Sequence, residues 1–143
     1  MLSLREKEIS VSSIRRGVRL IDLAAFTRQM ASMLEAGLTI PQALQTLSTE
    51  TASRVLQKVI TDILKQIESG ESFSGALQKH PEVFSRLYVN MVDAGERGGI
   101  LPDILTRLAT HSEKMHRLRS KVRSALTYPA IVSLVAIAVV SFL

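Results

Sequence analysis

The sequence predicts an all-α protein: a compact six-helix bundle followed by the start of a transmembrane helix. Apolar residues recur at helical spacing from residue 20 onward, and no segment alternates with the period of two that marks a strand. The last twenty residues carry no charge. With 143 residues, of which 46% are apolar and 22% charged, the chain is long enough for one folded domain and too apolar to be disordered.

The first two helices are separated by a glycine stop and a capping box. The stripe of apolar residues along one face of the first helix begins at Leu20 and ends before Gly37, a residue that favours a helix end. Thr39 is the expected N-cap of the second helix, and Gln42 stands three residues on, at capping-box spacing. This helix is expected to end within 47–50. The first stripe consists of Leu20, Leu23, Thr27, Met30 and Leu34.

The third helix has the cleanest stripe of 3.6-residue period in the chain, and Gly70 ends it. Ser72 then caps a short fourth helix over 73–79. His80 precedes Pro81, and a residue before proline is driven out of the helical region, so the fourth helix ends there. The stripe of the third helix is formed by Leu56, Val59, Ile60, Ile63, Leu64 and Ile67.

The fifth helix is expected to start near Val83 and to close either at Gly95 or at the Gly98-Gly99 pair. The sixth begins at Leu101 and has no glycine or proline over 103–122, so it can continue into the membrane. The fifth stripe contains Val83, Phe84, Leu87, Tyr88, Met91 and Val92; the sixth contains Leu101, Ile104, Leu105, Leu108, Met115, Leu118 and Val122.

A short pattern occurs twice, 33 residues apart, at 37–44 and 70–77. Both copies have a glycine, then a hydroxyl residue two positions on, then an apolar residue, and both end in Ala-Leu. The pattern is typical of a helix stop followed by an N-cap. We interpret it as a recurring linker rather than a duplication, because two copies are fewer than a solenoid needs.

The net charge of +5 is concentrated at the two ends of the chain. Residues 1–19 sum to +3, residues 20–113 to −3 and residues 114–143 to +5. A nucleic-acid-binding module normally carries its positive charge on the folded body, which is mildly acidic here. The absence of cysteine excludes disulfides, thiolate zinc sites and a cysteine nucleophile, and the absence of tryptophan argues against stacking on single-stranded nucleic acid.

The end of the chain has the composition of a membrane span. Residues 130–143 are almost wholly apolar, and 124–143 just reach the roughly 20 residues that a span needs. The alternative is a buried terminal helix of a soluble protein. Because the basic residues precede the run, the preceding domain is expected in the cytoplasm. We therefore expect a flexible basic arm over 1–19, a cytoplasmic helical-bundle domain over 20–125, and the truncated start of the first transmembrane helix over 126–143.

No catalytic motif is recognisable. The three histidines belong to no metal-binding or nucleophile pattern, and the glycine-rich 95–99 stretch lacks the spacing of a phosphate loop. Asp93 and Glu96 stand three residues apart and could hold a hard cation with help from a second chain, although a solvated helix face is the commoner use. Arg28 either faces a partner or pairs with an acid such as Glu35 or Asp93. We expect neither enzymatic activity nor a cofactor.

Three ordered motifs resemble the type II secretion F family of inner-membrane platform proteins. The first runs from Phe26-Thr-Arg-Gln29 through Met33-Leu34 and Gly37-Leu38 to Ala43-Leu44. The second covers Met91-Val92, Ala94-Gly95-Glu96, Gly99 and Leu101, and the third covers Lys121-Val122, Ala125-Leu126 and Tyr128-Pro129. Relatives continue through further membrane helices and a second copy of the helical domain, so the chain is expected to be an N-terminal fragment.

The resemblance implies a non-enzymatic scaffold in the bacterial inner membrane, with residues 1–125 in the cytoplasm. Its implied partners are a hexameric assembly ATPase, other inner-membrane components, pilin or pseudopilin subunits, membrane lipid at the C-terminal segment, and a second copy in a homodimer. The residues expected as exposed contacts are Arg28, Glu96 and Arg97; those expected in the core or on a dimer face are Phe26, Leu34 and Met91. The alternative is a membrane-tethered helix-turn-helix module that binds nucleic acid.

Overall fold

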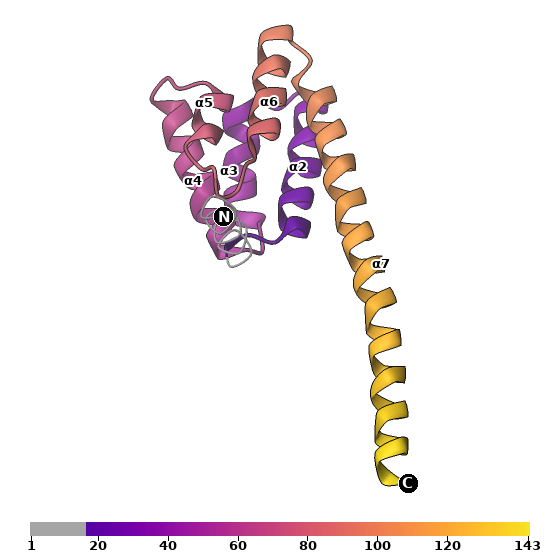
Figure 1. The fold of residues 1–143 in the computed structure, drawn as a ribbon. Helices are drawn as coiled ribbons and strands as arrows, with labels where there is room; N and C mark the ends of the chain where they lie inside the picture. Colours follow the sequence, from indigo (N-terminus) through magenta and orange to yellow (C-terminus); the bar gives the residue numbers. More distant parts are fainter. Residues whose placement is uncertain (1–16) are drawn as a thin grey trace, which may run out of the picture.

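The computed structural model describes residues 17–143, which form six α-helices and no strand (Figure 1). The predicted all-α fold with a long final apolar helix is confirmed. Of the arm expected over 1–19, residues 1–16 lie outside the described residues. The helices are α2 (Leu20–Glu35), α3 (Ile40–Glu50), α4 (Arg54–Glu68), α5 (Phe73–Gln78), α6 (Arg86–Gly98) and α7 (Leu101–Phe142).

The bundle is a closed ring of helix pairs. Each helix from α2 to α6 packs against the next one, α6 packs against α7, and α7 returns to pack most extensively against α2. Figure 1 shows α7 lying beside α2 and then continuing well past the other helices. The first and last helices of the bundle, α2 and α7, are therefore packed together, and α7 leaves the bundle from that contact.

The two copies of the repeated pattern fold alike. Gly37 and Gly70 have φ of 94° and 106°, the left-handed conformation that glycine adopts without steric cost. Each follows the last turn of a helix, and the next hydroxyl caps the following helix: the Thr39 oxygen accepts from the Gln42 N–H, and the Ser72 oxygen accepts from the Gly75 N–H. The capping box predicted at Thr39 is present. The closing Ala-Leu pairs, Ala43-Leu44 and Ala76-Leu77, are fully buried.

Helix α6 begins three residues later than the apolar pattern predicts. The start near Val83 is wrong because Ser85 has extended backbone and accepts a hydrogen bond from the Tyr88 N–H, which makes Ser85 the N-cap. Phe84 remains in the core, 1% exposed, but from the turn before the helix. Of the two predicted ends, Gly95 lies inside α6 and Gly99, with φ of 69°, closes it.

The core lies between all six helices and is built around three aromatic rings. Phe26 of α2 lies 6.2 Å from Phe84, and Phe84 lies 5.1 Å from Tyr88 of α6, in tilted arrangements that aromatic pairs favour. Helix α7 contributes its first turns only, because Ser112 is its last buried residue. The fully buried large residues are Phe26, Met30, Leu44, Leu47, Leu56, Ile60, Ile63, Phe73, Leu77, Phe84, Val92 and Leu105.

Candidate functional site

Arg28 joins α2 to α7. Its guanidinium donates to both carboxylate oxygens of Glu113, at 3.1 and 3.0 Å, and to the Thr110 hydroxyl at 3.2 Å. The hydrogen bonds from Arg28 hold the pKa of the Glu113 carboxyl below its usual range. The sequence suggested Glu35 or Asp93 as the acid, and the ion pair is instead formed with Glu113, 85 positions away. The Arg28 side chain remains 40% exposed, so part of it still faces solvent.

Glu96 holds α5 against α6. Its carboxylate accepts hydrogen bonds from the backbone N–H groups of Phe73 and Ser74, at 3.1 and 2.5 Å. These are groups of the first turn of α5, which have no partner within their own helix. A carboxylate is well suited to them, because the positive end of the helix dipole lies there. Glu96 is thus a half-buried structural contact between two helices.

Arg97 and Asp93 lie on the outer face of α6. The Arg97 guanidinium donates to Asp93 at 3.2 Å, and its side chain is 80% exposed. Asp93 also accepts from the Ser74 hydroxyl at 3.3 Å. The two carboxylates considered for a cation therefore each bond to protein donors, and no group of three or more potential metal ligands occurs within residues 17–143.

The residues expected in the core or on a dimer face differ in burial. Phe26 is 1% exposed and belongs to the core. Leu34 and Met91 are partly buried and pack against the edge of the same core. Both therefore keep some surface that another chain could cover, whereas Phe26 does not.

A buried hydrogen bond between α2 and α6 was not visible in the sequence. The hydroxyls of Thr27 and Tyr88 lie 2.8 Å apart, and the Thr27 oxygen is also 2.8 Å from the Leu23 carbonyl. Since the carbonyl can only accept, Thr27 donates to Leu23 and accepts from Tyr88. Burial raises the pKa of the Tyr88 phenol. The sequence signal that could have indicated this bond is Thr27 itself, a polar residue within the apolar stripe of α2.

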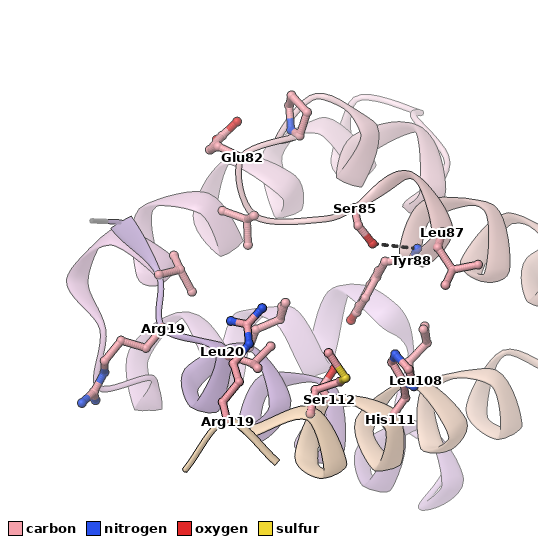
Figure 2. A pocket seen from close by; sticks show the side chains of 15 residues that line it. Arg19, Leu20, Glu82, Ser85, Leu87, Tyr88, Leu108, His111, Ser112 and Arg119 are labelled. Carbon is pink, nitrogen blue, oxygen red and sulfur yellow. Dashed lines mark hydrogen bonds between the residues drawn. The ribbon is translucent and has the colours of Figure 1, made fainter. Parts of the chain in front are cut away.

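An apolar cleft of about 550 Å³ opens where the start of α2, the start of α6 with the turn before it, and residues 108–119 of α7 meet (Figure 2). Leu20, Tyr88 and Leu108 line it from these three segments. His111 and Arg119 add polar groups from α7. The cleft contains no assembled nucleophile and base, and its surface is suited to apolar contact rather than to chemistry. The remaining lining residues are Val18, Arg19, Leu23, Pro81, Glu82, Val83, Ser85, Leu87, Ser112 and Met115.

Helix α7 has the dimensions of a membrane-crossing element. It runs for 42 residues through Pro129, and its apolar segment is not buried against the bundle at all. Within residues 17–143 it is the one helix long and apolar enough to cross a membrane. The alternative of a terminal helix packed inside a soluble globule is therefore not what the structure shows.

Comparisons with known proteins agree with this arrangement. The family described as type II secretion system (T2SS), protein F, matches residues 26–143. The type IV pilus assembly protein PilC of Thermus thermophilus is 48% identical over 138 residues, which cover 96% of this chain and 34% of that protein. PilC of Myxococcus xanthus is 48% identical over 127 residues, covering 89% of this chain and 30% of that protein.

A secretion protein is similar over the same region. The type II secretion system protein F of Aeromonas hydrophila is 36% identical over 129 residues, which cover 90% of this chain and 33% of that protein. The chain thus spans about a third of the length of the curated relatives it matches. The three motifs, the apolar helix and all of the bundle except the start of α2, residues 20–25, fall within the matched residues. The chain belongs to the family of type II secretion system protein F and type IV pilus assembly protein PilC.

Proposed function

We propose that this chain is the cytoplasmic helical domain and first membrane span of an inner-membrane platform protein in a type II secretion or type IV pilus assembly machine. In this role it has no enzymatic activity of its own. It couples a hexameric assembly ATPase on the cytoplasmic side to the movement of pilin or pseudopilin subunits at the membrane. Residues 1–125 lie in the cytoplasm, because the cations of 114–123 precede the apolar run.

The observation that supports this proposal is the continuity of α7. The same helix contributes Leu105 and Leu108 to the bundle core and runs without interruption to Phe142. A displacement of the bundle is therefore carried to the membrane segment along one hydrogen-bonded helix. A flexible linker at this point would absorb the displacement instead.

Contacts with the ATPase, with other inner-membrane components and with a second copy belong to this proposal. Arg97 is the most exposed of the three charged residues considered. It takes no part in the contact of Arg28 with Glu113 or in the contact of Glu96 with α5. We propose Arg97 as a direct contact, with the exposed part of Arg28 and the half-buried Glu96 acting mainly by holding their helices in place. Leu34 and Met91 are the proposed dimer-face residues, since both are partly exposed at the edge of the core.

Breaking α7 outside the bundle tests the coupling. Ser120 is exposed, so Ser120→Pro should disrupt the helix between the bundle and the apolar run without disturbing the core. In the bacterium that encodes the chain, we expect this change to abolish pilus assembly or secretion while the protein still accumulates in the membrane. Ser120→Ala is the matched control and should be active. Wild-type activity of Ser120→Pro would refute mechanical coupling through α7.

The ATPase contact is tested by co-purification of the full chain in detergent with the assembly ATPase of the same organism. We expect Arg97→Glu to weaken the association, while Lys58→Glu, the same change of charge at an exposed position of α4, should not. Absence of any association at high concentrations of both proteins would contradict the ATPase part of the proposal.

A further inference from the structure

An exposed apolar stripe continues along α7 beyond the bundle. Met115, Leu118, Val122 and Leu126 are 37%, 58%, 56% and 68% exposed. Their spacing of three and four residues puts them on one face of the helix. They line a groove that shares Leu20, Met115 and Arg119 with the cleft of Figure 2. A contiguous apolar surface of this kind in water is a mark of an interaction site.

Cations border the stripe on both sides. At about 100° per residue, Lys114 and Lys121 lie along one edge of the stripe, and Arg119 and Arg123 lie along the other. All four side chains are exposed, and none forms an ion pair within residues 17–143. Apolar positions bordered by charges on both edges are the pattern of a coiled-coil seam, in which the flanking charges select the partner.

Lipid does not account for the upper part of the stripe. If the hydrocarbon layer begins after Arg123, Leu118 lies about 9 Å and Met115 about 13 Å above Ser124, at about 1.5 Å per residue. The headgroup layer extends only about 5 to 7 Å beyond the hydrocarbon on each side. Met115 and Leu118 therefore stand in water above the membrane, where acyl chains do not reach them.

A second α7 is also a poor occupant. The helix carries five cations and no acid from Lys114 to Leu143. Two copies inserted in the same membrane run parallel, so a shared seam would place cations of one copy against cations of the other. Like charges at such flanking positions disfavour pairing. The partner that fits has acidic residues at these positions.

We propose that the seam formed by Met115, Leu118 and Val122, the part of the stripe that precedes the hydrocarbon layer, binds an α-helix of a partner protein that has its own apolar stripe and acidic residues on both edges. The partner helix lies along α7 on the cytoplasmic side of the membrane, and the end of it that is farther from the membrane lies toward the cleft of Figure 2. This inference deepens the proposed platform function, on which it rests for the position of the membrane, by giving the chemistry of one partner.

Two synthetic peptides of about 21 residues, three heptads each, test the seam. Both have leucine at the seam positions; one has glutamate at the flanking positions and the other has lysine. Each is labelled with a fluorophore and titrated with the full chain in neutral detergent, and binding is followed by anisotropy. We expect the glutamate peptide to bind, the lysine peptide not to bind, and the glutamate binding to weaken as salt is raised.

Charge reversal gives the sharper result. The double substitution R119E/R123E should weaken binding of the glutamate peptide about tenfold, since each exposed pair contributes about a factor of two and two attractions become repulsions. The same variant should gain affinity for the lysine peptide. The double substitution R54E/K58E, at two exposed positions of α4, is the matched control and should bind as the wild type does. The double substitution L118S/V122S should abolish binding of the glutamate peptide without changing thermal unfolding of the bundle.

Several results would overturn the proposal. Equal binding of both peptides, or an unchanged affinity in R119E/R123E, would show that the flanking charges do not select the partner. Because the chain has no cysteine, Leu118→Cys provides a single labelling site. A disulfide-linked dimer as the main species in nanodiscs would assign the seam to a second copy, and a spin label there that is accessible to oxygen but shielded from a water-soluble relaxant would assign it to lipid. Any of these results, with Ser120→Pro still inactive in cells, would refute the seam and leave the platform function standing.

Discussion

The hydrogen bond between Thr27 and Tyr88 offers a sharp test of how α2 and α6 are held together. Thr27 is 0% exposed and Tyr88 is 4% exposed, so neither hydroxyl has water as an alternative partner. Thr27→Val keeps the shape of the side chain but leaves the tyrosine hydroxyl buried without an acceptor. A buried group without a partner costs about 1 to 3 kcal/mol. We expect Thr27→Val to lower the free energy of unfolding by about 2 kcal/mol.

The reverse substitution is milder. In Tyr88→Phe the Thr27 hydroxyl still donates to the Leu23 carbonyl, so only the net value of one hydrogen bond is lost, about 1 kcal/mol. In the double variant no polar group is stranded, and we expect its cost to be about 1 kcal/mol, well below the sum of the two single costs. The sign of this coupling follows directly from which hydroxyl donates.

The assay is thermal unfolding of the full chain in detergent, followed by near-ultraviolet circular dichroism. For a bundle of this size, a loss of about 2 kcal/mol lowers the midpoint by about 10 °C. Tyr128→Phe is the control, since the Tyr128 side chain is 74% exposed and its removal should leave the midpoint unchanged. A larger effect for Tyr88→Phe than for Thr27→Val, or strict additivity in the double variant, would refute the assignment of donor and acceptor.

Three further predictions concern the other contacts of α6. Gly95→Ala should destabilise the chain by about 1 kcal/mol in chemical denaturation, because the added carbon would lie 3.2 Å from the Leu101 Cα of α7. The cost of this overpacking exceeds the gain in helix propensity, which is about 1 kcal/mol. A variant more stable than the wild type would contradict this prediction. Glu96→Ala should speed hydrogen exchange at the Phe73 amide while α4 stays protected, and unchanged exchange would show that the carboxylate does not hold α5. Because burial raises the pKa of Tyr88, the folded state keeps its proton longer than the unfolded state, so this contribution is complete below about pH 10 and is lost as the pH rises further. Alkaline titration by ultraviolet absorbance should therefore show the Tyr88 phenol ionising together with unfolding.

Acid should loosen the contact between α2 and α7. The pKa of Glu113 is lowered by Arg28, so the folded state favours the ionised carboxylate and its contribution is present above the ordinary value of 4.5. It is lost as the pH falls through the lower folded-state pKa. Arg28→Gln should remove this part of the acid dependence, measured as the unfolding midpoint against pH, and an unchanged profile would contradict the role of the ion pair.

The helix boundaries were predictable because their signals are local. Gly37 and Gly70 end helices through their own left-handed backbone conformation. Thr39 caps the next helix by accepting a hydrogen bond from the Gln42 N–H, three residues on. Val83 misled the prediction for α6 because apolarity marks burial, and a buried residue can lie in a turn as well as in a helix. The serine at 85 followed by helical spacing was the better signal for the start of α6.

The contacts between helices were not predictable in the same way. Arg28 and Glu113 are 85 positions apart, and Glu96 reaches an N-terminus more than twenty positions earlier. The charge pattern offers several acids to each arginine, and only the packing of α2 on α7 decides which one is near. The sequence therefore indicates which side chains are available for pairing, and the fold selects the partner.

The packing of α7 against the bundle determines where the molecule can bend. Sliding α7 out of the bundle would expose Leu105 and Leu108, and each fully buried leucine contributes about 1.5 to 3 kcal/mol, so bundle and helix move as one body. Beyond Ser112 no side chain of α7 is buried, and beyond the Arg28–Glu113 ion pair no hydrogen bond or ion pair among residues 17–143 joins α7 to another helix. Pro129 has no N–H to donate to the Ala125 carbonyl, so the ladder is weakest there. Bending of α7 should therefore concentrate at 125–129, just inside the uncharged run, whereas displacements along the helix axis still pass this point because the helix continues to Phe142.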